Sequence, residues 1–202
     1  PAMKRSNLTV WTKTQTERVL LEGKQARALV VHPKGSEPKT VGARREIILS
    51  AGSIGSPQIL ELSGIGGANR LRDVGIQPLH DLPGVGKNLS DHLQIRAAFK
   101  VSGVQTLNTL SASLLGRAKM GMDFVFARKG PLTMAPSQLG VFCKSDPSRS
   151  TANLQYHVQP LSLDAFGEPL HSFDAFTASV CNLRPESRGS VHVRSAQHQD
   201  AP

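Results

Sequence analysis

A pattern suited to binding a phosphate lies at residues 46–52, where a run of apolar residues leads into small ones. The apolar run reads as a buried strand, and the small residues are Ser50, Ala51 and Gly52. Small residues at the carboxyl end of a strand allow a dinucleotide to approach the backbone closely. The same residues also fit an ordinary strand-to-helix turn in which they serve only for packing, so the pattern leaves both interpretations open.

A helix start follows this strand end and would direct free amides toward a bound phosphate. Ser56 is suited to cap the helix, and Pro57 to fill its first position, where the missing N–H costs nothing. Gly64 is suited to end the helix after roughly two turns, because glycine tolerates the left-handed conformation. A phosphate at such an N-terminus is stabilised by the helix dipole and by unpaired N–H groups.

A second segment spans residues 81–92 and reads Asp-Leu-Pro-Gly-Val-Gly-Lys-Asn-Leu-Ser-Asp-His, with the glycines and proline typical of a tight loop. Together, residues 52–66 and 81–92 resemble the signature regions of the glucose-methanol-choline (GMC) family of FAD-dependent oxidoreductases, choline and alcohol dehydrogenases among them. The resemblance is clearest over residues 7–92. It continues more loosely through residues 153–157 and 185–191.

The resemblance implies an enzyme that binds FAD and oxidises an alcohol to an aldehyde or ketone by hydride transfer to the flavin. The substrate would be a choline-like or other primary or secondary alcohol, and oxygen, a quinone or a dye would accept the electrons. By analogy, the backbone of Val19 would contact the adenine end of FAD, and Ser50, Ala51 and Gly52 would line the dinucleotide. Each has a structural alternative: Val19 as a core strand residue and Ser50 as a turn cap.

Two parts that such an enzyme needs are absent from the sequence. No Gly-x-Gly-x-x-Gly fingerprint follows a strand, and Gly64-x-Gly66 follows a helix, so it is not a phosphate loop. The resemblance places the catalytic histidine and its partner beyond Pro202, so no catalytic residue is assigned. We therefore expect an internal segment of a longer enzyme, inactive alone. His92 is expected to fix a loop, and His157 either faces a substrate cavity or serves the sheet.

The composition excludes several other kinds of protein. With 39% hydrophobic and 19% charged residues, the chain fits a folded globular protein rather than a disordered one. Residues 1–50 hold ten Lys or Arg against four Glu, but the basic residues are scattered and aromatic residues make up only 4% of the chain. Because nucleic-acid binding needs a continuous basic face, we expect no nucleic-acid partner.

The two cysteines, Cys143 and Cys181, lie in separate strand-like runs and are expected to stay reduced and unpaired. The seven histidines show no metal-ligand spacing, so we expect no metal site. No apolar stretch of the sequence is long enough to span a bilayer. We expect a cytoplasmic protein, with peripheral association with the inner membrane as the alternative, and the oligomeric state stays open.

The remaining pattern predicts an α/β (α+β) fold in two domains. Residues 1–90 would form part of a doubly wound FAD-binding domain that includes a β-meander, and residues 91–202 part of an antiparallel-sheet substrate domain. Strands are predicted at residues 8–12, 18–21, 26–31, 46–52, 92–101, 138–144, 154–158, 173–183 and 190–193, with a further strand beginning near residue 39. Helices are predicted over residues 56–63, 68–74 and 111–129.

Two other functions are compatible with the motifs. The first is a non-catalytic binding module on a GMC-like scaffold, which a parent sequence without the catalytic histidine pair would favour. The second is another FAD-dependent class, such as an amine oxidase, that shares only the strand-to-helix element. The downstream residues 63–66 and the Asn-Leu-x-Asp-His segment argue against the second function.

Overall fold

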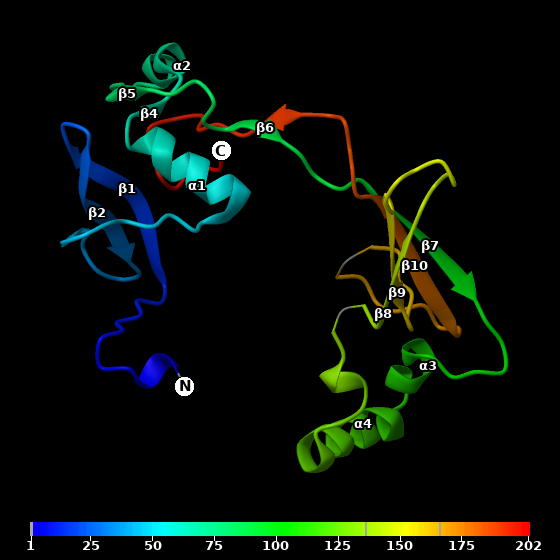
Figure 1. Ribbon diagram of the computed structural model, residues 1–202. Coiled ribbons are helices and arrows are strands. Elements are labelled where there is room, and N and C mark those ends of the chain that lie inside the picture. The colour runs from blue at the N-terminus through cyan, green and yellow to red at the C-terminus, as the bar shows by residue number, and fades with distance from the viewer. Residues whose placement is uncertain (1, 136, 166) are drawn as a thin grey trace. The chain divides into compact units, whose positions relative to one another are not determined.

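A computed structural model of the chain describes residues 2–135, 137–165 and 167–202 (Figure 1). The chain forms two compact units, one of Pro1–Ser90 with Ser187–Pro202 and the other of Asp91–Glu186. Residues 187–202, which the sequence predicted as part of the second domain, pack with the first unit instead. Which cofactor or substrate each unit binds stays a prediction.

The first unit begins with the β-meander that the sequence predicted. The strands β1, β2 and β3 pair in that order, and both pairs are antiparallel. Helix α1 packs against β1. The elements of this unit are a 3-10 turn η1 (Ala2–Lys4), β1 (Thr14–Glu22), β2 (Gln25–Pro33), β3 (Lys39–Gly42), α1 (Gly52–Leu62), β4 (Ile65–Gly66), α2 (Ala68–Asp73), β5 (His80–Asp81), β6 (Lys87–Leu89) and β11 (Gly189–Ser190).

Two strands predicted for this unit do not form. Residues 8–12 and 46–50 have no strand partner within the described part of the chain. A strand needs a neighbour to pair its backbone groups, and propensity alone does not supply one. Ile48 illustrates the result, because 76% of this apolar residue is exposed.

A small core holds the rest of the first unit together. Leu62 at the end of α1, Leu71 of α2 and Ile76 pack with Val193 from the C-terminal segment. Leu71 is completely buried. The pairs β4–β5, which is parallel, and β6–β11, which is antiparallel, flank this core. Val193 therefore anchors residues 187–202 to helices that lie more than a hundred residues earlier in the sequence.

The second unit is built on one antiparallel sheet. Its strand order is β7-β10-β9-β8, and the inward and outward residues of β10 alternate in burial along the strand. The elements are β7 (Gln94–Lys100), α3 (Leu107–Ala112), α4 (Leu114–Ala127), a 3-10 turn η2 (Pro131–Thr133), β8 (Leu139–Cys143), β9 (Leu154–Gln159) and β10 (Ala175–Asn182). This confirms the predicted antiparallel sheet, but of the strand expected at residues 190–193 only Ser190 is in a strand, namely β11 of the first unit.

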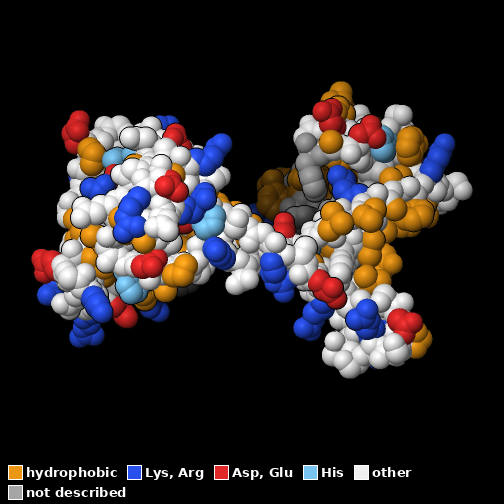
Figure 2. Space-filling model, turned by 90° about the horizontal axis from the view of Figure 1, so that it is seen from above, with side chains coloured by type: hydrophobic (Ala, Val, Ile, Leu, Met, Phe, Trp, Pro, Cys, Tyr) orange, Lys and Arg blue, Asp and Glu red, His pale blue; other side chains and the backbone are white. Residues whose placement is uncertain are grey.

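The long helix predicted over residues 111–129 is two helices. Ser113 adopts an extended conformation between α3 and α4, and its hydroxyl accepts a hydrogen bond from the Gly116 amide. Two large apolar residues at the start of α4 face outward, with Leu114 83% and Leu115 81% exposed. Apolar side chains gather over the second unit in Figure 2, whereas basic and acidic side chains intermingle on the visible face of the first.

Both cysteines are free, as predicted. Cys143 lies on β8 and Cys181 on β10, with β9 between them. Two strand spacings amount to roughly 9–10 Å, which exceeds the Cα separation that a disulfide can bridge. Among the described residues, no helix combines the length and the apolar character needed to cross a membrane.

The start of α3 is fixed by a carboxylate from the sheet. Asp174 accepts hydrogen bonds from the Thr109 hydroxyl at 2.6 Å, the Thr106 amide at 2.7 Å and the Thr106 hydroxyl at 2.9 Å. These bonds, the Thr109 hydroxyl first and the Thr106 amide next, hold the pKa of Asp174 below its ordinary value of 3.8. The charged carboxylate thus joins the start of β10 to the first turn of α3.

Gly86 and Gly52 give a matched test of close packing in the first unit. Both have a left-handed φ, +75° and +76°. A Cβ on Gly86 would overlap the carbonyl oxygen of Val191 and lie 2.7 Å from His192 Nδ1, whereas nothing lies within 4 Å of one on Gly52. We expect Gly52→Ala to lower the free energy of unfolding by about 1–2 kcal/mol, and Gly86→Ala by about 2–5 kcal/mol. Urea unfolding measures both variants, and an equal loss of unfolding free energy in the two would contradict this packing.

Asp174 predicts a pH-dependent stability for the second unit. Because its folded pKa lies below the unfolded value of roughly 3.9, the charged carboxylate adds stability above that pH. This stability is lost as the pH falls through the folded pKa. Asp174→Asn should therefore be less stable than the wild type at pH 7, and the difference should narrow below pH 4. Urea unfolding followed by circular dichroism measures this, and a difference that stays constant across this range would refute it.

Candidate functional site

The first motif, residues 52–66, contains α1, but the helix begins earlier than the sequence predicted. Ala51 is the N-cap residue, and α1 runs for 11 residues from Gly52, about three turns. Ser56 lies inside the first turns, where its hydroxyl accepts a hydrogen bond from the Ala51 amide at 3.1 Å. Ser56 is therefore not the cap, and Pro57 is not the first helical residue. The cause is Gly52, whose left-handed φ of +76° turns the chain into the helix four residues before Ser56.

The start of α1 is open to an anionic ligand. Ser50, Ala51 and Gly52 are exposed, and so are the next two residues. No side chain caps the helix at Ala51, and its first turn contains no acidic residue. Apart from the Ala51 amide, which donates to Ser56, the amides of this first turn donate no hydrogen bond to an N-cap side chain, and no acidic residue there neutralises the positive end of the helix dipole.

The first motif and the second motif, residues 81–92, both line one cavity at this end of α1. The cavity has a volume of about 360 Å³ and is lined by Ser53, Pro57, Gly86, Lys87, Asn88, Leu89, Ser90 and Val191. Pro57 has no N–H, so the Ser53 carbonyl receives no hydrogen bond from the residue four positions later. Lys87 adds a positive charge, and Gly86 presents no side chain. The Lys87 cation suits a phosphate-bearing ligand, whereas the free Ser53 carbonyl is an acceptor and suits a hydrogen-bond donor.

Val19 lies at the opposite end of α1 from Gly52. It is 6% exposed and borders a separate cavity of about 420 Å³. A helix of 11 residues is roughly 16 Å long. The structure therefore does not bring Val19 together with Ser50, Ala51 and Gly52, although an extended dinucleotide can span that length. That these four residues contact FAD stays a prediction.

Ser63 ties Val19 to the helix. Its hydroxyl accepts a hydrogen bond from the Val19 amide at 2.8 Å and donates one to the Ile59 carbonyl at 2.5 Å. Ser63 is 3% exposed. A ligand that bonds the Val19 amide must displace this hydroxyl. Ser63 belongs to residues 63–66 of the first motif, but the sequence pattern assigned it no role; it was the last residue of the predicted helix, whereas in the structure it is the C-cap residue of α1.

Glu61 is the second residue whose role the sequence did not reveal. Its side chain is completely buried, with Oε1 2.6 Å from His192 Nδ1 and Oε2 accepting a hydrogen bond from the Val193 amide at 2.8 Å. Both partners come from the C-terminal segment. Helical periodicity gives no sign of this burial, because Glu61 lies about 200° around the helix from the buried Ile59.

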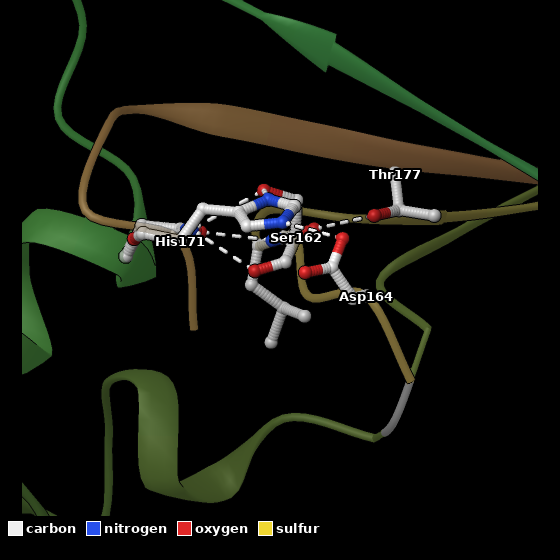
Figure 3. A network of polar contacts seen from close by, with 6 residues as sticks. Ser162, Asp164, His171 and Thr177 are labelled. Carbon is white, nitrogen blue, oxygen red and sulfur yellow. Dashed lines mark hydrogen bonds and ion pairs between the residues drawn. The ribbon is translucent and has the colours of Figure 1, made fainter. Parts of the chain in front are cut away.

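A serine, a histidine and an aspartate meet in the second unit without forming a nucleophilic site (Figure 3). Ser162 Oγ lies 2.8 Å from His171 Nδ1, and His171 Nε2 lies 3.1 Å from Asp164 Oδ1. Ser162 is completely buried, and its amide, carbonyl and hydroxyl all bond the side chain of Asn108. Since a substrate cannot reach this hydroxyl, the network serves to fix its loop against α3.

His157 lines a cavity of about 200 Å³ on the second unit's sheet. Ser179 of β10 pairs in register with both Arg96 and His157, so three polar residues form a row across the sheet beside this cavity. Whether His157 faces a substrate stays a prediction. His92 makes a local loop contact, because its amide donates a hydrogen bond to Asp91 at 2.8 Å.

Removing His192 should expose the cost of burying Glu61. His192→Ala leaves the carboxylate with the Val193 amide alone, and loss of one partner of a buried pair costs about 3–5 kcal/mol. His80 is an exposed histidine of the same unit, so His80→Ala is the matched control and should change the free energy of unfolding by less than about 0.5 kcal/mol. Urea unfolding measures both, and similar values for the two variants would show that the Glu61–His192 pair contributes nothing.

Comparison with known proteins places these features in one family. Residues 1–94 match the model described as GMC oxidoreductase. The oxygen-dependent choline dehydrogenase of Pectobacterium carotovorum subsp. carotovorum (strain PC1) is 37% identical over 198 residues, which are 98% of this chain and 35% of that protein. An alcohol dehydrogenase (acceptor) of Pseudomonas putida is 37% identical over 201 residues, 98% of this chain and 36% of that protein. The chain thus spans about a third of the length of these relatives.

Solved structures share the fold. A formate oxidase has a TM-score of 0.82 at 21% identity, covering 94% of this chain and 38% of that one. Pyridoxine 4-oxidase from Mesorbium loti has a TM-score of 0.75 at 24% identity, covering 99% of this chain and 35% of that one. These likenesses confirm the mixed helix-and-sheet fold. Since the motif resemblance, the family model and the curated relatives agree, the chain belongs to the GMC oxidoreductase family.

Proposed function

We propose that this chain is part of an FAD-dependent oxidoreductase that oxidises the hydroxyl group of an alcohol to an aldehyde or ketone. The observation that carries the proposal is the cavity of about 360 Å³ in which the two family motifs meet. Family membership supports it, because relatives that align along almost the whole chain are named choline and alcohol dehydrogenases.

The residues around this cavity fit a dinucleotide. FAD carries two linked phosphates, and their negative charge suits the uncapped first turn of α1 and the Lys87 side chain. Gly86 has no side chain, which lets the backbone at Val191 close one wall of the cavity. The bound flavin supplies the hydride acceptor, whereas these residues supply binding and orientation.

The proposed substrate is a small alcohol, with choline as the first candidate because several relatives carry its name. The proposed electron acceptor is oxygen, a quinone or an artificial dye. The complete gene product that carries these residues should reduce a dye when choline or a primary alcohol is added. A flavin-containing preparation that reduces no dye with any tested alcohol would favour the non-catalytic scaffold.

Gly52 tests the cofactor assignment of the first motif. In the complete gene product, Gly52→Val would place a branched side chain at the exposed start of α1 and should remove most of the bound flavin. The matched control is Gly35→Val, since Gly35 has the same φ of +76° and equally open space but lies in the turn after β2. Both changes should cost about 1–2 kcal/mol in backbone strain. The measurement is flavin absorbance per folded protein, and equal flavin content in both variants would mean that Gly52 serves only the geometry of α1.

A further inference from the structure

Three potential metal ligands meet in the first unit away from the motif cavity. Glu17 comes from β1, His32 from β2 and His198 from the C-terminal segment. One ligand atom from each side chain can be chosen so that all three lie within 4.8 Å of one another. His32 Nε2 lies 2.5 Å from Glu17 Oε2, and His198 Nδ1 lies 3.9 Å from the same oxygen.

The backbone explains the positions of Glu17 and His198. The register of β1 and β2 shifts between Thr16 and Arg18, so Glu17 is the extra residue of an irregularity in the ladder. Such a bulge redirects a side chain out of the regular alternation. The His198 carbonyl accepts a hydrogen bond from the Gln15 side chain at 3.0 Å, which holds the C-terminal segment against β1.

The imidazole rings of His32 and His198 are stacked face to face. Their centroids are 3.9 Å apart, and their planes differ by 21°. The lone pair of an imidazole nitrogen lies in the plane of its ring, so the two stacked rings direct their lone pairs nearly parallel, and one ring must turn out of the stack to bind the same ion as the other. The other oxygen of Glu17 forms an ion pair with Arg18, so Oε2 is the oxygen that faces the histidines.

We propose that Glu17, His32 and His198 bind one divalent transition-metal ion, with Zn²⁺ as the first candidate. Imidazole nitrogens and a carboxylate oxygen are established zinc ligands at roughly 2.0–2.2 Å, which keeps tetrahedral ligands roughly 3.3–3.5 Å apart. The separations of 2.5 and 3.9 Å lie on either side of that value, so a side-chain rotation that also unstacks the two rings reaches it. The ion takes the place of the hydrogen bond between His32 and Glu17, and water fills the fourth position.

The burial of the cluster suits a metal that joins segments of the fold. The side chains of Glu17, His32 and His198 are 14%, 24% and 13% exposed, which shields the ion but leaves a path for it. Mg²⁺ and Ca²⁺ prefer sites made of oxygen ligands, so a site with two imidazoles selects against them. The bound ion would fasten the C-terminal segment to the β1–β2 hairpin.

Titration of the metal-free 202-residue chain with Zn²⁺ by calorimetry tests this proposal. The wild type should bind one Zn²⁺ at this site and no Mg²⁺. His32→Ala and His198→Ala should weaken binding by roughly 100-fold or more, since loss of even an outer-shell partner costs 10–100-fold. The control is His92→Ala, because His92 Nδ1 lies 4.0 Å from Cys181 Sγ and forms the competing thiol-containing pair. Unchanged Zn²⁺ affinity in His198→Ala, or its loss in His92→Ala, would overturn the site.

Thermal melting separates a lost ligand from a lost fold. At a Zn²⁺ concentration one hundred times Kd, the melting temperature of the wild type should rise by roughly 5–10 °C. Glu17→Gln keeps the size of the side chain but removes its charge, so the folded variant should lose at least about tenfold in Zn²⁺ affinity. A folded Glu17→Gln protein that retains both the wild-type affinity and the wild-type temperature shift would refute the proposal. Neither measurement depends on flavin or on turnover.

Discussion

The buried carboxylate of Glu61 is the constraint on which the first unit depends. Removing a carboxylate from water is costly unless hydrogen bonds and a counter-charge replace its hydration. The residues that supply its hydrogen bonds, His192 and Val193, lie 131 and 132 positions later in the sequence. The chain must therefore leave the first unit, complete the second and return. That return makes the first unit a single folded body rather than a hairpin beside two short helices.

The candidate cofactor cavity is a consequence of this return. Val191 donates its amide to the Gly86 carbonyl at 2.8 Å, and β11 pairs with β6 directly before it. Because Gly86 lacks a side chain, the returning backbone can lie against the second motif, while Glu61 holds the next residues against the first. The motifs meet at one cavity because a third segment contacts both, and neither motif carries that information itself.

The sequence predicted the elements whose stability is local. The β1–β2–β3 meander and α2 followed from turn residues and apolar runs, and the antiparallel sheet of the second unit from its alternating strands. It failed where a distant partner decides the outcome. Residues 46–50 have strand composition but no strand neighbour among the described residues, and α1 starts at Gly52 because its backbone turns there. The break at Ser113 depends on one side-chain hydrogen bond that periodicity does not register.

The cluster of Glu17, His32 and His198 shows the same limit for a binding site. Metal motifs are found in a sequence when one helix or loop supplies neighbouring ligands at a fixed spacing. Here the ligands come from a bulge in β1, the end of β2 and the returning segment, so no such spacing exists, and the sequence led us to expect no metal. The Glu61 contacts bring residues 192 and 193 to α1, and five residues later His198 reaches the hairpin. A buried carboxylate that sets the path of the chain thereby also sets which imidazoles can share an ion.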